Sequence, residues 1–552
     1  MTKQAKRPKK SVVKNKKMRW LKYSSCVLLL CGLGLCLMYI FLTKDVSIRL
    51  LEPRTGTAVA DAEVFFNGRQ YVSDDTGLVT FSNVRFGKKS AQFFKPFYQS
   101  GRIHFTVNPF KRTPQQTVTM SATGEVVQAT VKNKLTGRTI SGITIKASNG
   151  GQGRTNSAGS ATLVLPYGTK STSATVSGNE IVDTTITLFN ANDALTNSVA
   201  VLPKLKIFSV QKVQSGVAVV QTNFDGADAK TVVEATGLEQ ADDTYLLMSP
   251  GAHYFVLKSK RDESSMGKLY SYSAKDTTLE TIEQQEQQSY IPIGWIGMSF
   301  VYRTYNQNVP QWQNGRESIK SYNAVTKIVT TLDTTKGEGA GPIDYVGELY
   351  ENTYLLEGKI FYTKKWQSSY YYGGRYIDKK MIFAVINADG SNQKSLAQWQ
   401  AGYNAKIKSA QSAPKKINIF IELDGVNRTN YEYENDKIKE SSSTDVDFTN
   451  RDKFADYYLS PNGVLTAWTQ ATPSGKTSYT ISSTGTVGSP LDIGKYPLSV
   501  IGWYDDDYVL LTGADSQLFV ASRLGSLFGG VPVRVAGVNS PTHIYRSFGY
   551  GR

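Results

Sequence analysis

The chain has 552 residues, 40% of them hydrophobic, and a formal net charge of +17 at pH 7. Residues 1–22 carry ten Lys and Arg and no acidic residue, which leaves only +7 for the rest of the chain. So dilute a charge does not indicate nucleic-acid binding. All three cysteines, Cys26, Cys31 and Cys36, lie in one short segment. The remaining chain therefore has no disulfide, thiolate metal site or cysteine nucleophile.

The three cysteines belong to the only long apolar run, Cys26–Leu42. With its flanking aromatic residues it reaches the ~20 residues needed to cross a bilayer, which predicts a transmembrane helix at 23–43. The basic tail at 1–22 should stay cytoplasmic, facing anionic lipid, with the bulk of the chain extracytoplasmic. A cleaved signal peptide is one alternative, but no small-residue cleavage pattern follows the run. A lipoprotein with Cys31 as the lipidated residue is the other, but the preceding Leu28-Leu29-Leu30 lacks the small residues that such processing prefers. We expect a single-pass protein of the cell membrane.

An internal repeat follows the apolar run. Residues 55–88 and 136–170 share turn residues at an offset of 81 or 82, for example Thr55-Gly56 with Thr136-Gly137. Short β-branched and aromatic strands separated by Asn-Gly and Asp-x-Gly turns predict small β-sandwiches. We expect two such domains, at 45–120 and 124–203.

The repeated pattern, T-G-x-x-[VI] followed by D-x-x-G and [FY]-G, resembles the carboxypeptidase-regulatory-like and PEGA-type domains of bacterial surface proteins. The second copy departs from it, because it inserts a glycine-rich hairpin and lacks the acidic turn. The resemblance implies spacer or binding modules without catalysis. The lack of cysteine in so long an exterior also fits a bacterial surface protein.

From about Leu205 the pattern changes to segments of roughly 40–55 residues, each with two pairs of apolar strands. One segment contains Ser460-Pro461-Asn462-Gly463, and another contains Asn387-Ala388-Asp389-Gly390-Ser391. Repeated four-stranded units predict a β-propeller. The turns resemble those of TolB-like and dipeptidyl-peptidase-type propellers. We expect six to seven blades over 205–552, without the hydrolase domain that follows the propeller in the peptidases.

The expected fold is thus an all-β ectodomain, with two small sandwiches and a six- to seven-bladed propeller, behind one N-terminal transmembrane helix. Two aromatic-basic segments of the propeller are the candidates for partner binding, because Tyr and Trp in loops offer flat amphipathic surface. The alternative is that these tyrosines stack on one another in long hairpins. The candidate residues are Trp366, Tyr370, Tyr371, Tyr372, Arg375, Tyr376, Tyr302, Arg303, Tyr305 and Trp312.

Common catalytic motifs are missing from the sequence. Its three histidines, His104, His253 and His543, are far apart, and there is no H-E-x-x-H, nucleophile elbow, Walker A loop or dinucleotide fingerprint. The acidic run Asp505–Asp507 is interpreted as a turn rather than a cation site. We expect no catalytic residue, metal or cofactor, and a scaffold that binds a protein or a cell-wall polymer. There are two alternatives. One is a propeller hydrolase or lyase acting on surface polysaccharide, and the other is a subunit of a secretion or pilus assembly.

Overall fold

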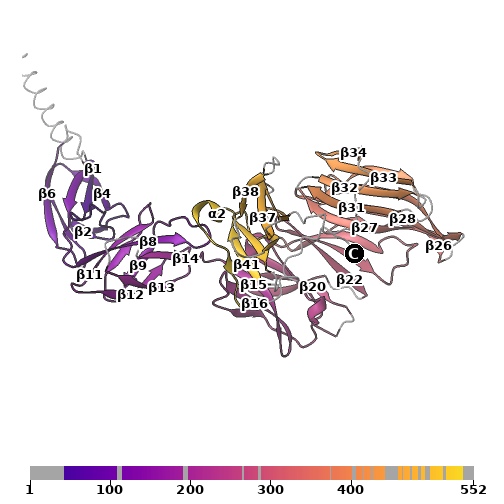
Figure 1. Ribbon diagram of the computed structural model, residues 1–552, viewed down its shortest axis with the longest axis horizontal. Helices are drawn as coiled ribbons and strands as arrows, with labels where there is room; N and C mark the ends of the chain where they lie inside the picture. Colours follow the sequence, from indigo (N-terminus) through magenta and orange to yellow (C-terminus); the bar gives the residue numbers. More distant parts are fainter. Residues whose placement is uncertain are drawn as a thin grey trace, which may run out of the picture. The chain divides into compact units, whose positions relative to one another are not determined.

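The structure is a computed structural model, shown in Figure 1. It describes residues 43–108, 115–190, 197–263, 266–283, 287–342, 344–372, 375–400, 406–413, 416–423, 427–441, 458–462, 464–472, 475–482, 487–491, 498–513 and 517–538. The chain divides into two compact units. One contains the described residues up to Lys132 together with Thr139–Val201, and the other contains Asn133–Arg138 and the described residues from Leu202 onward.

The first unit contains two sets of seven strands with the same topology. The first set forms a three-stranded sheet in the order β4-β1-β7 and a four-stranded sheet in the order β3-β2-β5-β6. The strands are β1 (Thr43–Leu51), β2 (Glu63–Phe66), β3 (Arg69–Val72), β4 (Leu78–Arg85), β5 (Gly87–Phe94), β6 (Gly101–Val107) and β7 (Gln116–Thr119).

The second set repeats both orders, as β11-β8-β14 and β10-β9-β12-β13. Its strands are β8 (Glu125–Asn133), β9 (Thr144–Ala147), β10 (Gln152–Arg154), β11 (Ser160–Leu165), β12 (Ser171–Ser177), β13 (Thr184–Phe189) and β14 (Ser198–Val201). Each strand takes the place of the one seven earlier in the chain, so the sequence repeat corresponds to a repeat of the fold.

Equivalent turns in the two sets use equivalent hydrogen bonds. Asp74 Oδ1 accepts from the backbone N–H groups of Thr76 and Leu78, at 2.9 and 2.8 Å. Asn156 Oδ1, 82 positions later, accepts from those of Ala158 and Ser160, at 3.0 and 3.1 Å. Aspartate and asparagine serve equally in such a turn because only the side-chain oxygen is used. Asp74 is therefore explained as turn chemistry.

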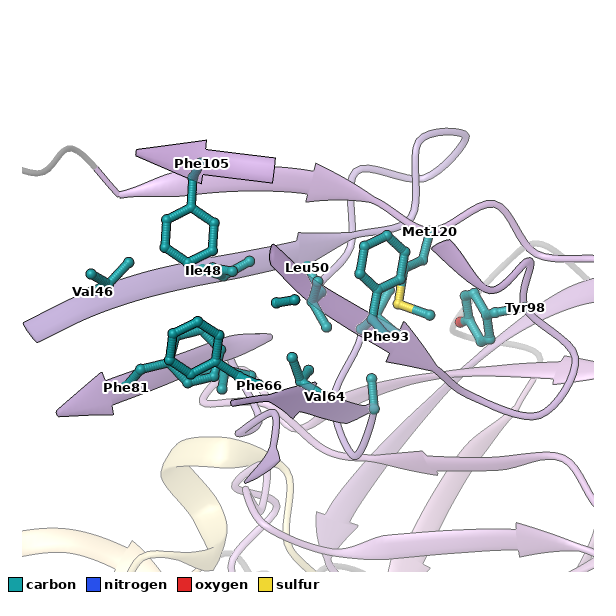
Figure 2. Packing of buried hydrophobic residues seen from close by; sticks show 14 of the residues in the cluster. Val46, Ile48, Leu50, Val64, Phe66, Phe81, Phe93, Tyr98, Phe105 and Met120 are labelled. Carbon is teal, nitrogen blue, oxygen red and sulfur yellow. The ribbon is translucent and has the colours of Figure 1, made fainter. Parts of the chain in front are cut away.

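Each set buries apolar residues between its two sheets, and Val126 and Val164 of the second set also pack against the first core. Figure 2 shows the first core, in which Phe66 of β2 stacks on Phe81 of β4 with ring centroids 4.3 Å apart. Ile48 and Leu50 of β1 lie in the same layer and are fully buried. The second core is built from smaller aliphatic residues such as Ile145 and Leu163. The first core therefore depends on aromatic packing and the second on aliphatic packing.

The second unit contains seven successive sheets among its described residues, and neighbouring strands in each sheet are antiparallel. The first four sheets comprise β15 (Lys206–Val213), β16 (Gly216–Asn223) and β17 (Lys230–Val233); β18 (Tyr245–Met248), β19 (Tyr254–Ser259), β20 (Lys268–Ser273) and β21 (Thr278–Glu283); β22 (Gln288–Ile296), β23 (Ser299–Asn306), β24 (Glu317–Asn323) and β25 (Ile328–Thr334); and β26 (Gly337–Gly341), β27 (Asp344–Leu356), β28 (Lys359–Tyr372), β29 (Arg375–Asn387) and β30 (Lys394–Gln400).

The last three sheets comprise β31 (Lys406–Ala413), β32 (Lys416–Leu423), β33 (Asn427–Glu434) and β34 (Lys437–Ser441); β35 (Tyr458–Leu459), β36 (Leu465–Thr472), β37 (Gly475–Ser482) and β38 (Val487–Leu491); and β39 (Ser499–Trp503), β40 (Tyr508–Thr512), β41 (Leu518–Ser522) and β42 (Val533–Arg534). Each sheet follows chain order from strand to strand. Helical structure in the described residues is short, with α2 (Gly525–Phe528) and two 3-10 turns, Ala241–Asp243 and Pro250–Ala252.

The seventh sheet packs against the first. The Tyr504 hydroxyl lies 2.9 Å from the Lys206 carbonyl oxygen and 3.1 Å from that of Gly251. The Tyr504 ring meets Phe224 edge-on, with centroids 4.8 Å apart. Successive antiparallel sheets of three to five strands, the last of which contacts the first, are consistent with a β-propeller.

The all-β prediction is confirmed for the described residues. The predicted basic tail at 1–22 and the predicted membrane helix at 23–43 lie outside them, except for Thr43, which begins β1. Within the described part of the chain, no helix has both the length and the apolar character needed to cross a membrane.

Candidate functional site

The candidate site lies where the β23–β24 loop meets the fourth sheet of the second unit. That sheet has the longest strands of the unit, β27, β28 and β29, at 13, 14 and 13 residues. A Cβ atom added at Gly337 or at Gly347 would lie 2.5 Å from the Gln311 carbonyl oxygen. Only glycine allows an approach this close, so these two glycines let the loop rest on β26 and β27.

Five side chains form an aromatic-basic cluster at this contact: Tyr305, Gln311, Trp312, Arg316 and Tyr345. The rings of Trp312 and Tyr345 lie 5.7 Å apart with an interplanar angle of 51°. The Arg316 guanidinium lies 5.0 Å from the centre of the Tyr305 ring and also donates to the Tyr305 hydroxyl. The Gln311 side-chain oxygen accepts from Tyr345 at 2.8 Å and from Arg316 at 3.3 Å.

The structure separates the predicted binding residues into three groups. Tyr305 and Trp312 join the cluster, together with Tyr345 from 33 positions further along the chain. Tyr302, Arg303 and Trp366 are buried within β23 and β28. For these three, the expectation of side chains at loop tips is corrected, because both strands are covered by neighbouring sheets.

The third group lies in the β28–β29 hairpin. Its backbone pairs Tyr371 with Tyr376 and Tyr372 with Arg375. The side chains of Tyr370, Tyr371, Tyr372, Arg375 and Tyr376 lie outside the described ones, so their role as contact residues stays a prediction. At the base of the hairpin, the Lys380 ammonium lies 5.0 Å from the Trp366 ring.

Behind the cluster, buried ion pairs join the third sheet to the fourth. Lys364 of β28 lies 2.9 Å from Asp333 of β25 and 3.0 Å from Glu348 of β27. Arg303 donates to Glu317 at 2.8 Å and to the Tyr350 carbonyl oxygen at 3.1 Å. These carboxylates are bound by cations in the protein interior, so they do not form a free acid-base pair for hydrolysis.

Buried tyrosines complete this network. The Tyr350 hydroxyl donates to Asp333 at 2.7 Å, and the Tyr302 hydroxyl donates to Glu283 at 3.1 Å. Burial is the main reason that the pKa of each hydroxyl lies well above its ordinary value, and the adjacent carboxylate adds to the effect. Both hydroxyls therefore keep their protons at neutral pH and act as hydrogen-bond donors.

Four buried nitrogen donors around the cluster have no acceptor among the described residues. They are Arg303 Nε, Gln311 Nε2, Arg316 Nε and Trp366 Nε1. Buried donors are normally satisfied, so this concentration on two adjacent sheets is unusual. Each of these nitrogen atoms is itself shielded from solvent, so an external partner does not reach it in this conformation.

The acidic run Asp505–Asp507 is occupied by structural contacts. Asp505 accepts from the backbone N–H groups of Asp507 and Tyr508, at 2.8 and 2.9 Å. Asp507 pairs with Arg523 at 2.9 Å, and Asp506 accepts from the Asn462 N–H at 2.9 Å. Within the described ranges, no group of three or more His, Cys, Asp or Glu side chains is placed to hold a metal ion.

The first unit contains a small polar cleft lined by residues of both sets of strands, among them Lys95. Lys95 is only 5% exposed, and its ammonium donates to the Ala60 carbonyl oxygen at 2.6 Å. Burial lowers the pKa of Lys95 to about 8, and the negative charge of Asp61 partly opposes this shift. The amine thus titrates far below the ordinary range of lysine.

This burial predicts a pH-dependent stability. Folded protein loses the Lys95 proton near pH 8 and unfolded chain near 10.5. Between these values the unfolded state binds more protons, so the free energy of unfolding rises with pH. We expect the first unit to gain roughly 3 kcal/mol from pH 8 to 10.5, at ~1.4 kcal/mol per pH unit, relative to Lys95→Met. Hydrogen exchange of β2 and β5 amides in both proteins measures the difference, and parallel pH profiles would contradict it.

Several residues of the site were not found from the sequence. Tyr345 lies in a segment without an aromatic-basic pattern, and Gln311 is an uncharged, non-aromatic residue beside the predicted Trp312. The carboxylates Glu283 and Asp333 look like ordinary strand residues. A signal was nevertheless present: Thr278–Glu283 and Ile328–Asp333 align at an offset of 50, each ending in an acidic residue. Aligning the strand repeats would have singled out the two carboxylates.

Comparison with known proteins leaves the family open. No family model and no curated protein matches the sequence. Solved structures with some similarity include an oligogalacturonate lyase in complex with manganese (11% identity, 57% of this chain and 85% of that one, TM-score 0.30). TolB from Acinetobacter baumannii (13%, 63% and 78%, TM-score 0.24) and prolyl oligopeptidase B from Galerina marginata (10%, 60% and 51%, TM-score 0.34) are others. TM-scores this low do not assign a fold or a function.

Proposed function

We propose that the protein is a membrane-anchored, extracytoplasmic scaffold that binds a protein or cell-wall polymer partner without catalysis. In this proposal the apolar run Cys26–Leu42 is the anchor and the basic tail at 1–22 lies in the cytoplasm against anionic lipid. The two seven-stranded repeats are sandwich-like spacers, and the seven sheets of the second unit are the blades of a propeller. A bacterial cell envelope is the proposed setting.

The observation that carries the proposal is the aromatic-basic cluster of Tyr305, Gln311, Trp312, Arg316 and Tyr345. Tyr305, Trp312 and Arg316 are half-buried, so part of each side chain remains available to a partner. Hydrogen bonds and ring contacts already hold Gln311 and Tyr345 in place. Ordered aromatic side chains lose little conformational entropy on binding, which favours their use as anchors in an interface.

The chemistry of the cluster favours a ligand with flat faces and many oxygen atoms. Indole and phenol rings stack on sugar rings and on planar peptide groups. The half-buried Arg316 guanidinium carries several N–H donors, which match acceptor oxygens. Glycan chains and extended peptides both supply this combination, so both classes of partner remain in the proposal.

Crosslinking of the full-length protein in its native cells tests the proposal. Trp312→Ala removes the indole that packs on Tyr345, and we expect it to reduce the capture of at least one crosslinked partner fivefold or more. Partners are compared by mass spectrometry for proteins and by sugar analysis for polymers. Unchanged capture by Trp312→Ala would contradict a binding role for this cluster.

Trp399→Ala is the matched control. Trp399 packs on Tyr431 with ring centroids 5.2 Å apart and the same interplanar angle of 51°, but it lies on β30. The two substitutions remove the same side chain from similar ring pairs. Loss of capture in both variants would indicate general damage to the unit rather than loss of a contact.

A further inference from the structure

The last strands of the second and third sheets carry acidic residues at equivalent positions. Glu283 of β21 pairs with Leu269, and a β-bulge follows at Tyr270. Asp333 of β25 pairs with Ile319, and a β-bulge follows at Lys320. The strand, the register and the bulge are the same, at an offset of 50 residues. The two carboxylates therefore occupy one structural position in successive repeats.

Each carboxylate is bound by a tyrosine and a lysine of the sheet that follows. Glu283 accepts from the Tyr302 hydroxyl at 3.1 Å and from Lys320. Asp333 accepts from the Tyr350 hydroxyl at 2.7 Å and from Lys364 at 2.9 Å. A carboxylate has enough lone pairs for both donors, and such charge-assisted bonds are stronger than neutral ones. We call this arrangement, a carboxylate bound by a tyrosine and a lysine of the next sheet, a latch. One latch joins the second sheet to the third, and another joins the third to the fourth.

The contact between the fourth and fifth sheets has no latch at the equivalent position. The position equivalent to Glu283 and Asp333 in β30 is Ala397, which pairs with Phe383 just before a β-bulge. The contact of the fourth sheet with the fifth is apolar instead, with Phe361, Phe383 and Ile419 buried there. The two latches therefore fix only the second, third and fourth sheets as a block, and the aromatic-basic cluster lies on this block.

We infer that Asp333 is the positioning residue of the aromatic-basic cluster. It holds Lys364, and Lys364 in turn holds Glu348 of β27. Glu348 lies next to Gly347, where the loop carrying Gln311 and Trp312 rests, and three residues from Tyr345. The inference rests on the proposed function only in taking the cluster as the binding surface. The latch itself follows from the geometry.

Asp333→Asn tests the inference in the full-length protein. The substitution keeps the shape and removes the charge, so the ion pair with Lys364 is lost, while the amide oxygen still accepts the Tyr350 hydrogen bond. We expect at least fivefold faster hydrogen exchange over 344–350 and 307–316, while β15–β17 exchange as in the wild type. We also expect capture of the crosslinked partner to fall at least fivefold. Asp333→Glu, which restores the carboxylate, should recover most of both effects.

The two readouts separate the possible failures. Unchanged exchange over 344–350 in Asp333→Asn overturns the inference whatever the partner does. Faster exchange with undiminished capture also overturns it, because the latch would then not position the binding surface. Failure of the proposed function appears elsewhere, as undiminished capture by Trp312→Ala with Asp333 intact.

Discussion

Glu283→Gln is expected to lower the free energy of unfolding of the second unit by about 3–5 kcal/mol, the usual cost of removing one partner of a buried ion pair. Lys320 is nearly buried and loses its carboxylate in this variant, so its charge is left uncompensated. Glutamine still accepts the Tyr302 hydrogen bond, which confines the change to the charge. Urea unfolding followed by tryptophan fluorescence measures the effect, because six of the seven tryptophans lie beyond residue 202.

Glu280→Gln is the matched control for this prediction. Glu280 lies on the same strand, β21, and its carboxylate also pairs with a lysine of the third sheet, Lys327, at 2.6 Å. Both side chains of this ion pair are exposed, at 43% for Glu280 and 55% for Lys327, so water screens the pair. We therefore expect a much smaller loss than for Glu283→Gln. If the two variants lost similar free energies of unfolding, burial of the Glu283–Lys320 ion pair would not determine how much that pair stabilises the unit.

The strand content was predictable because its signals are local. Short runs of β-branched and aromatic residues between glycine turns fix strands wherever they occur. The turn at Asp74 and its counterpart at Asn156 illustrate this, because one side-chain oxygen and a glycine three residues later define each turn. Such turns need no tertiary contact, so an offset of 82 was visible in the sequence.

Which side chains of the second unit are buried and which are exposed was not predictable from such local signals. Strand β23 buries Phe300, Val301, Tyr302, Arg303 and Thr304 in one uninterrupted run. A sheet covered on both faces shows no alternation of apolar and polar residues, so the sequence does not reveal which residues reach solvent. Tyr302 and Arg303 therefore resembled a loop insertion, although they lie in a strand between two sheets.

The pairing of Trp312 with Tyr345 was also beyond sequence reasoning. The two rings meet only after the chain has passed through β24, β25 and β26 and turned into β27. Their contact depends on how the third sheet packs on the fourth, which is a tertiary property. The latch at Asp333 depends on the same packing, and only the repeat offset of 50 residues hinted at it.

Phe66→Ala is expected to destabilise the first unit by about 3–5 kcal/mol, the usual cost of truncating a buried phenylalanine. Phe66 stacks on Phe81 at 4.3 Å and on Phe105 at 5.9 Å, so its removal leaves a cavity between the two sheets. The described residues of this unit include no tryptophan, and hydrogen exchange of the β1 and β4 amides in the full-length protein is the measurement.

Phe65→Ala is the matched control for this prediction. Phe65 is the preceding residue of the same strand, but its side chain points to the opposite face and is 43% exposed. The strand propensity lost is the same in both variants, and only Phe66 contributes to the core. We expect Phe65→Ala to change the free energy of unfolding by no more than about 0.5 kcal/mol. If the two variants lowered the free energy of unfolding equally, Phe66 would not stabilise the packing between the two sheets. The aromatic core would then not be the source of this unit's stability.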